Sequence, residues 1–365
     1  MKGVLRVATI SGIPVQIHWS FSLLFFWVYY EGSKIGMLWD EILMFGFLIM
    51  SLFFCVVLHE FGHAFSARYY GVGTRDITLS PIGGIARLNQ MPEKPIQEFM
   101  VALAGPLVNI AIAILIALGL WLFSPNFLPE GNSSMAETFS SRTNFFPILL
   151  GLNVIMAVFN LIPAFPMDGG RMLRSLLSMK LGRLKATRIA SIVGRILAVA
   201  FLAYAIYNQD LIMGFISVFV FVMAWQEYRM VIMEGILDRK NLKELMRVDF
   251  SKFLYTDSVQ QVVDTFVEGV EKNFLIFDDW GRQRGVLKRA SILAAMQKKD
   301  FDSAIDKYIT LAAAHLNSTD SLKVAYELMQ NPDHLIIPVF EDGMMVGVLD
   351  QKVLDDYLRA EQRRG

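Results

Sequence analysis

Hydrophobic residues are concentrated in the first two thirds of the chain, where they form six runs separated by short polar segments. The runs are Val15–Tyr30, Ile42–Tyr70, Phe99–Phe123, Phe145–Leu161, Ile189–Tyr207 and Leu211–Met233. A helix of about 17–25 apolar residues crosses the ~30 Å hydrocarbon core of a membrane. The pattern therefore predicts about six transmembrane helices. Gly and Pro interrupt some runs, and a membrane tolerates such breaks where the backbone lines a buried or watery site.

A different pattern separates the second run from the third. Between Gly73 and Met91, the short runs Thr74–Leu79 and Ile85–Leu88 flank a turn that contains Pro81, Gly83 and Gly84. Two strand-like runs around a Pro/Gly turn are typical of a β-hairpin.

The distribution of Lys and Arg orients the predicted helices. Positive residues gather in alternate connections: Lys2 and Arg6; Arg68, Arg75, Arg87 and Lys94; Arg171, Arg174, Lys180, Arg183, Lys185 and Arg188; Arg229, Arg239 and Lys240. The other connections contain few Lys or Arg residues. Positive connections remain in the cytosol, so both termini and residues 71–95, 163–187 and 241–365 are expected there, with residues 124–144 outside the cell membrane.

The composition agrees with a membrane protein and limits the partners. Hydrophobic residues make up 54% of the 365 residues, against about 45–50% in soluble domains, and the mean hydropathy is +0.44. The formal net charge is zero, which gives no reason to expect a nucleic-acid partner. The single cysteine, Cys55, cannot form an internal disulfide.

The candidate chemistry lies near the end of the second run, in His59-Glu60-Phe61-Gly62-His63. Helical positions four apart share a face, so His59 and His63 can offer two nitrogens to one metal. Glu60 can then act as a base toward a zinc-bound water, as in zinc metalloproteases. A chance spacing is the alternative, but unpaired His and Glu in an apolar helix are costly and occur mainly at functional sites. The predicted topology places this site inside the membrane, nearer the cytosolic side.

A catalytic zinc normally takes a third protein ligand. His18, Cys55 and Asp168 are the candidates, and Asp168 is favoured because it follows a run that ends on the cytosolic side, at the depth of His59 and His63. An aspartate in this Pro- and Gly-rich segment is equally compatible with a turn residue that caps the next helix. Spacing alone leaves these two roles open.

Taken together, the motifs resemble those of the site-2 protease family of intramembrane zinc metalloproteases. The resemblance rests on residues 59–63, on residues 160–171 (NLIPAFPMDGGR), on Gly105-Pro106-Leu107-Val108-Asn109 and on the segment 17–20, and covers most of residues 1–233. It implies that Asp168 is the third zinc ligand and that Asn160 holds substrate or stabilises the oxyanion. It also implies that the hairpin engages substrate as an edge strand.

The last 125 or so residues contain a duplicated unit. Thr256-Asp257-Ser258 recurs at 319–321, and Gly285-Val286-Leu287 recurs at 347–349, a periodicity that marks a repeated module. The unit resembles a tandem pair of CBS domains, which implies an α/β fold, an adenine nucleotide as ligand and a homodimer. The sequence departs from the ribose-binding aspartate pattern, with Ser291 and Val353 at those positions. A dimerisation or regulatory docking module without a ligand is the alternative.

These observations predict a polytopic helical protease domain, residues 1–235, and an α/β CBS-pair domain, residues 241–365, divided near residue 300. We expect one zinc ion per chain, single-span membrane proteins as substrates, and regulation by the CBS domains. A metal transporter or sensor that uses the same His/Asp cluster is the alternative function, although transport usually needs several polar groups along a path. A catalytically silent scaffold is a third, and the intact Glu60 argues against it.

Overall fold

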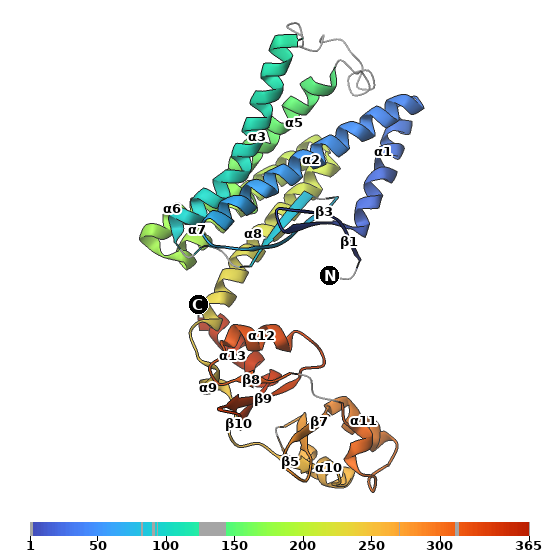
Figure 1. Ribbon diagram of the computed structural model, residues 1–365, viewed down its shortest axis with the longest axis vertical. Helices are drawn as coiled ribbons and strands as arrows, with labels where there is room; N and C mark the ends of the chain where they lie inside the picture. Colours follow the sequence, from blue (N-terminus) through green and yellow to red (C-terminus); the bar gives the residue numbers. More distant parts are fainter. Residues whose placement is uncertain are drawn as a thin grey trace. The chain divides into compact units, whose positions relative to one another are not determined.

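The computed structural model describes residues 3–81, 83–89, 92, 94–123, 144–269, 271–310 and 314–364. Contacts divide the chain into two compact units, Met1–Arg229 and Met230–Gly365, which are coloured from blue to yellow and from yellow to red in Figure 1. Residues 124–143, most of the expected external loop, lie outside the described residues.

The first unit is dominated by helices. They are α1 (Ser22–Lys34), α2 (Trp39–Tyr69), α3 (Pro95–Phe123), α5 (Phe145–Leu161), α6 (Asp168–Leu181), α7 (Arg183–Asn208) and α8 (Leu211–Leu237). Among the described residues, α2, α3, α7 and α8 are long and apolar enough to cross a membrane, and α5 is a shorter apolar helix. The predicted polytopic helical fold is confirmed.

The first predicted transmembrane run differs from the expectation. Ile13–His18 forms strand β2, and helix α1 begins only at Ser22 and has 13 residues, which is about 20 Å of helix and too short for the hydrocarbon core. The physical reason is the period-two alternation of Ile13, Val15 and Ile17, which begins just before the run. Ile13 and Val15 are buried among the side chains of the sheet core, and that burial selects a strand.

A four-stranded sheet lies alongside α2 (Figure 1). Its strand order is β1 (Val4–Ile10), β2, β3 (Thr74–Ser80) and β4 (Gly83–Leu88), with β2 and β3 parallel and the other pairs antiparallel. The predicted hairpin is confirmed as β3 and β4, and β4 is an edge strand. Ile77 and Leu79 pack with Phe53 and Phe61 of α2, which fixes the hairpin against the helix that carries the histidines.

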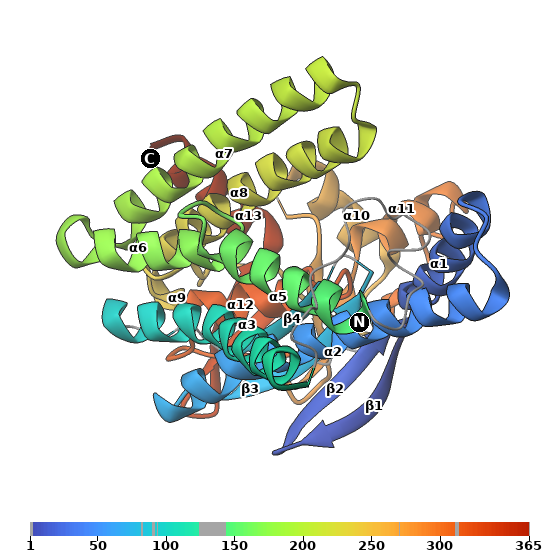
Figure 2. The same cartoon turned by 90° about the horizontal axis from the view of Figure 1, so that it is seen from above.

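Close packing of α2 against α3 brings two further helices to the same region. A Cβ on Gly62 would lie 2.8 Å from the carbonyl oxygen of Ala104, so this glycine permits the close approach of the two backbones. Helix α3 also contacts α5 and α6, and α6 contacts α7. Figure 2 shows α3 and α5 running beside α2, with α6 leading into α7. The start of α6 is thereby placed next to the end of α2.

The second unit is built from two copies of one pattern. Its elements are α9 (Leu242–Leu245), β5 (Lys252–Leu254), α10 (Val259–Glu268), β6 (Phe274–Phe277), β7 (Gln283–Leu287), α11 (Arg289–Gln297), β8 (Leu316–Asn317), α12 (Leu322–Met329), β9 (Ile336–Glu341), β10 (Met344–Asp350) and α13 (Gln351–Arg364). In both sheets the first strand is parallel to the second, and the second is antiparallel to the third. The predicted duplication is confirmed.

The two copies exchange backbone hydrogen bonds reciprocally. Arg247, before the first strand of one copy, pairs with Val348 of the other through N–H···O distances of 2.8 and 2.9 Å. Thr310, before the first strand of the second copy, pairs with Val286 at the same two distances. Each copy therefore adds one backbone pairing to the edge of the other's sheet.

Candidate metal centre

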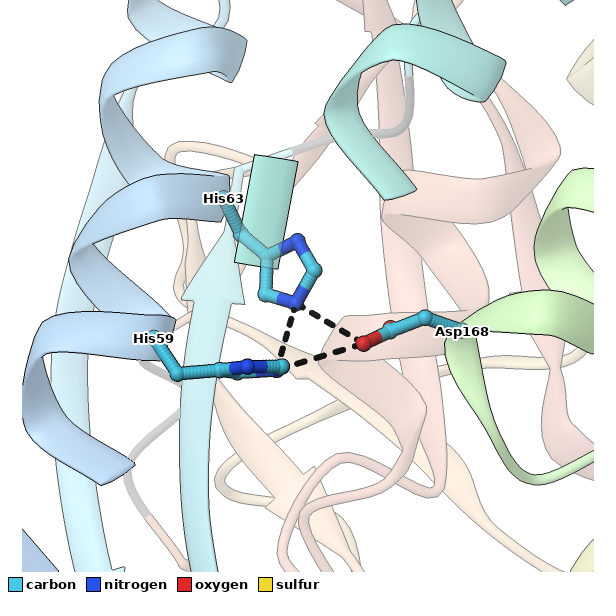
Figure 3. Close-up of side chains that lie close together, drawn as sticks. All are labelled: His59, His63 and Asp168. Carbon is cyan, nitrogen blue, oxygen red and sulfur yellow. Dashed lines mark hydrogen bonds and ion pairs between the residues drawn. The ribbon is translucent and has the colours of Figure 1, made fainter. Parts of the chain in front are cut away.

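Three side chains from two distant segments converge at the end of α2 (Figure 3). The two Nε2 atoms of His59 and His63 lie 3.1 Å apart, and Oδ2 of Asp168 lies 3.2 Å from the first and 3.1 Å from the second. All three residues are buried. The histidines are four positions apart on one face of α2, as the sequence predicts, and Asp168 is the first residue of α6.

The hydrogen bonds made by the Nδ1 atoms of both imidazoles determine whether the Nε2 atoms, which face Asp168, can act as metal ligands. His59 Nδ1 lies 3.2 Å from Oδ1 of Asn109, and His63 Nδ1 lies 2.7 Å from the carbonyl oxygen of Val101. Both oxygens only accept hydrogen bonds, so the tautomer with the proton on Nδ1 pairs with each of them, and a neutral ring of that tautomer offers a lone pair at Nε2. Two lone pairs and a carboxylate oxygen repel one another at 3.1–3.2 Å, and a shared cation satisfies all three. The donor set N, N, O suits zinc.

Gly105 of α3 provides the space for this cluster. A Cβ at this position would lie 2.3 Å from His63 Nε2 and 2.7 Å from His59 Nε2, where ordinary contacts begin near 3.4 Å. The absence of a side chain leaves a cradle beside the two ligand atoms. The cradle and the lone-pair arrangement together fit a bound metal ion.

Two glycines bring Asp168 to the histidines. A Cβ on Gly169 would lie 2.2 Å from the carbonyl oxygen of Ile162, and one on Gly170 would lie 2.5 Å from the carbonyl carbon of Ala164. The first turn of α6 therefore packs directly on the segment that follows α5. Although Asp168 does begin a helix, its carboxylate is directed at the two imidazoles (Figure 3).

A cavity of about 510 Å³ opens beside the cluster. All five residues singled out from the sequence line it: His59, Glu60, His63, Asn160 and Asp168. The other two ligand candidates lie elsewhere. His18 bonds to Ser20 Oγ at 2.7 Å, and Cys55 is buried beside Asn153.

Strand β4 forms one wall of the cavity. The backbone N–H of Ala86 donates to Glu60 Oε2 at 2.9 Å, which holds that carboxylate at the cavity. A Cβ on Gly84 would lie 2.9 Å from Glu60 Cγ and from Val56 Cγ1, so only glycine allows the edge strand to run this close to α2.

Charged residues behind the cavity were not identified as a group from the sequence. Arg174 is 2% exposed and its guanidinium bonds to the Glu98 carboxylate, with Nε at 2.7 Å. The Glu227 carboxylate lies 3.6 Å from Nη1 of Arg174 and 3.9 Å from Nη2 of Arg171. Glu227 and Arg171 also line the cavity. In the sequence, Arg171 and Arg174 follow Asp168 closely and are three positions apart. Their charges predicted only the side of the membrane on which this segment lies, and not the ion pairs.

The second unit contains a cavity of about 370 Å³ whose lining comes from both copies. Its lining residues include Arg247, Asn273, Arg289, Asp350 and Val353. Burial raises the pKa of the Asp350 carboxyl above its usual range. Val353, at one position of the expected ribose-binding aspartate, faces this cavity without a carboxylate.

A bundle of membrane-length helices with a buried His/His/Asp cluster and an adjacent glutamate defines a multi-pass membrane metalloprotease. The sequence model of peptidase family M50 matches residues 47–204. Zinc metalloprotease MJ0392 of Methanocaldococcus jannaschii is 31% identical over 363 residues, which is 99% of this chain and 96% of that protein. The chain therefore belongs to peptidase family M50 and is a zinc metalloprotease of the site-2 protease type, as its motifs predicted.

Parts of the chain are also similar to solved structures. The site-2 protease from Methanocaldococcus jannaschii is 34% identical, with a TM-score of 0.45, over 62% of this chain and 95% of that chain. The CBS-domain pair of protein MJ0100, solved in complex with 5′-methylthioadenosine and S-adenosyl-L-methionine, is 14% identical with a TM-score of 0.29. That match covers 32% of this chain and 98% of the other.

Proposed function

We propose that this protein hydrolyses peptide bonds within or next to the transmembrane segments of single-span, membrane-bound regulatory proteins. The observation that carries the proposal is the convergence of His59 Nε2, His63 Nε2 and Asp168 Oδ2 beside Glu60, at a cavity between apolar helices. Metal-assisted hydrolysis needs a base and a Lewis acid at one place, and these residues supply the first and can hold the second.

We propose that His59, His63 and Asp168 hold one zinc ion per chain. When bound, zinc supplies a Lewis acid that makes water a nucleophile near neutral pH. Replacement of Asp168 by Ala removes one of three ligand atoms, so purified Asp168→Ala is expected to lose most of its zinc in elemental analysis. Full zinc occupancy in that variant would remove Asp168 from the ligand set.

Glu60 is proposed as the general base and acid. Its Oε2 accepts the Ala86 N–H, which fixes the carboxylate while leaving Oε1 available to take a proton from water and deliver it to the leaving amine. Asn160 lines the same cavity from the end of α5. Its amide is proposed to hold the substrate or to stabilise the oxyanion.

Strand β4 is proposed as the docking edge for the substrate. An extended peptide can add to an exposed strand edge through main-chain hydrogen bonds, and residues 83–86 of β4 line the cavity beside Glu60. A transmembrane helix must unwind before its peptide bond can be attacked, and an edge strand offers partners for the backbone groups that unwinding releases.

We propose that the protein resides in the cell membrane with both termini in the cytosol. The Lys and Arg distribution supports this orientation. His59 is the twenty-first residue of α2, about 30 Å along that helix, which supports a site on the cytosolic side.

The C-terminal repeats are proposed to regulate cleavage, with an adenine nucleotide as candidate ligand and a homodimer as candidate assembly. The cavity shared by the two copies supports a ligand site, and Arg247, Arg289 and Lys352 provide positive charge there. Ser291 and Val353 lack the ribose-binding carboxylate. Calorimetric titration with AMP and ATP tests nucleotide binding. If no heat of binding is measured at millimolar concentrations, the repeats act as a docking module without a nucleotide.

The protease and transporter functions are separable in one experiment. Wild type and Glu60→Gln are reconstituted in vesicles with candidate single-span membrane proteins, and both cleavage and zinc uptake are followed. A protease gives cleavage that Glu60→Gln abolishes, without zinc flux. Zinc uptake that survives Glu60→Gln, without cleavage of any candidate by wild type, would contradict the proposal.

A further inference from the structure

Two asparagines are fully buried inside the apolar helices next to α2, namely Asn109 on α3 and Asn153 on α5. Both are 0% exposed. Each has one half of its amide hydrogen-bonded and the other half without a partner among the described residues. They form a natural pair for comparison, because only one of them reaches the metal centre.

Asn109 uses the acceptor half of its amide. Oδ1 lies 3.2 Å from Nδ1 of His59, while Nδ2 has no hydrogen-bond partner within the described part of the chain. Asn153 uses the donor half instead. Its Nδ2 donates to the carbonyl oxygen of Leu149 at 2.9 Å and lies 3.5 Å from Cys55 Sγ, and its Oδ1 is the unpaired atom.

Stability alone does not explain Asn109. A buried amide N–H without a partner destabilises the fold, and an apolar residue of the same size would avoid that cost. Among the described residues, the side chain of Asn109 makes no hydrogen bond to the backbone of its own helix, whereas Asn153 bonds to the carbonyl four residues earlier. The feature that distinguishes Asn109 is its contact with His59.

The two imidazoles differ in how their outer nitrogens are held. His63 Nδ1 donates to a backbone carbonyl, that of Val101, which side-chain substitution cannot remove. Within the described part of the chain, His59 Nδ1 has the side chain of Asn109 as its single hydrogen-bond partner. The orientation and tautomer of His59 therefore depend on one replaceable amide oxygen.

We propose that Asn109 is a positioning residue that sets the tautomer of His59, keeping the proton on Nδ1 and the lone pair of Nε2 directed at Asp168 and His63. Removing such an outer partner typically weakens metal binding by 10–100-fold. This inference rests on the proposed zinc site, and it adds a residue from a third helix to the two segments that supply the ligands.

The test measures the zinc dissociation constant of the full-length protein by competition with a chelator, together with thermal stability in the absence of zinc. The variants are Asn109→Leu, Asn109→Asp, the matched control Asn153→Leu, and His59→Ala. Asn109→Leu is expected to bind zinc 10–100-fold more weakly, with zinc-free stability close to that of wild type, because it removes the unpaired Nδ2–H but leaves His59 Nδ1–H without its acceptor. Asn109→Asp restores the acceptor and should bind at least as tightly as wild type. Asn153→Leu should stay within about threefold of wild type.

The results distinguish a failure of the proposed role of Asn109 from a failure of the proposed zinc site. Wild-type zinc affinity in Asn109→Leu, with His59→Ala impaired, would overturn the positioning role while leaving the metal site in place. Equal losses in Asn109→Leu and Asn153→Leu would also overturn it, since packing would then be the cause, as would an Asn109→Asp variant as weak as Asn109→Leu. Zinc binding unchanged in His59→Ala would instead contradict the proposed metal site itself.

Discussion

Replacing Gly105 by alanine is a sharp perturbation of the metal centre, because it adds one methyl group at a defined place. The new Cβ would lie 2.3 Å from His63 Nε2, 2.5 Å from His63 Cε1 and 2.7 Å from His59 Nε2. Ordinary contacts start near 3.4 Å, so the His63 ring or the α3 backbone must move by about 1 Å. A Zn–N bond is about 2.0–2.1 Å long, and a displacement of that size breaks it.

The expected result of Gly105→Ala is a zinc affinity at least 100-fold lower than that of wild type, a loss beyond the 10–100-fold range typical of outer partners. Cleavage should fall in parallel. Helix propensity works in the opposite direction, because Ala is favoured over Gly inside a helix by about 1 kcal/mol. Loss of zinc therefore cannot be attributed to a weaker α3 helix.

Gly119 is the matched control, since it lies on the same helix and a Cβ there would meet nothing within 4 Å. Gly119→Ala should keep wild-type zinc affinity and activity. The assay is chelator competition on both purified variants, with cleavage of a single-span substrate as the second readout. If Gly105→Ala bound zinc and cleaved like wild type, the proposed geometry of the metal cradle would be refuted.

Three further predictions concern Asn160, the buried Arg174–Glu98 ion pair and the membrane orientation. Asn160→Ala should keep zinc and fold but slow cleavage by about 10²–10³; a wild-type rate in a stable, zinc-loaded variant would remove this role. Arg174→Met leaves the Glu98 carboxylate buried without its partner and should reduce the free energy of unfolding by about 3–5 kcal/mol, measured by denaturant titration in detergent, whereas Arg174→Met combined with Glu98→Gln should lose much less. Trp280→Cys on a Cys55→Ala background should react with impermeant thiol reagents only from the cytosolic side, and external labelling would reverse the proposed orientation.

The local part of the site could be predicted from sequence because it follows from helix geometry. Residues four apart share a face, so the pairing of His59 and His63 needed only the assignment of a helix. Asp168 is separated from His63 by 105 residues, and its approach depends on the packing of α6 against α3, which in turn packs against α2. Spacing could not determine that packing, so only the motif resemblance favoured Asp168 over a helix-capping role.

Tertiary contacts decided what the sequence analysis missed. The last four residues of the strand Ile13–His18 fell within a predicted apolar run because the alternation is short and the partner strand Thr74–Ser80 is distant in sequence. Arg174 was counted as a cytosolic topology signal, yet it is buried against Glu98 from another helix. Gly105 and Asn109 belonged to a recognised motif, but their contacts with the histidines arise only where α2 and α3 pack together.

The central claim is that this zinc site cuts a peptide bond in or beside a membrane-spanning segment. Mass spectrometry of the products from a single-span substrate, incubated in lipid with wild type or Glu60→Gln, tests it most directly. We expect one pair of new termini within the transmembrane segment or a few residues from it, absent with Glu60→Gln and with a zinc chelator, and regained when zinc is restored. New termini confined to distant soluble loops, or identical products from Glu60→Gln, would contradict the account.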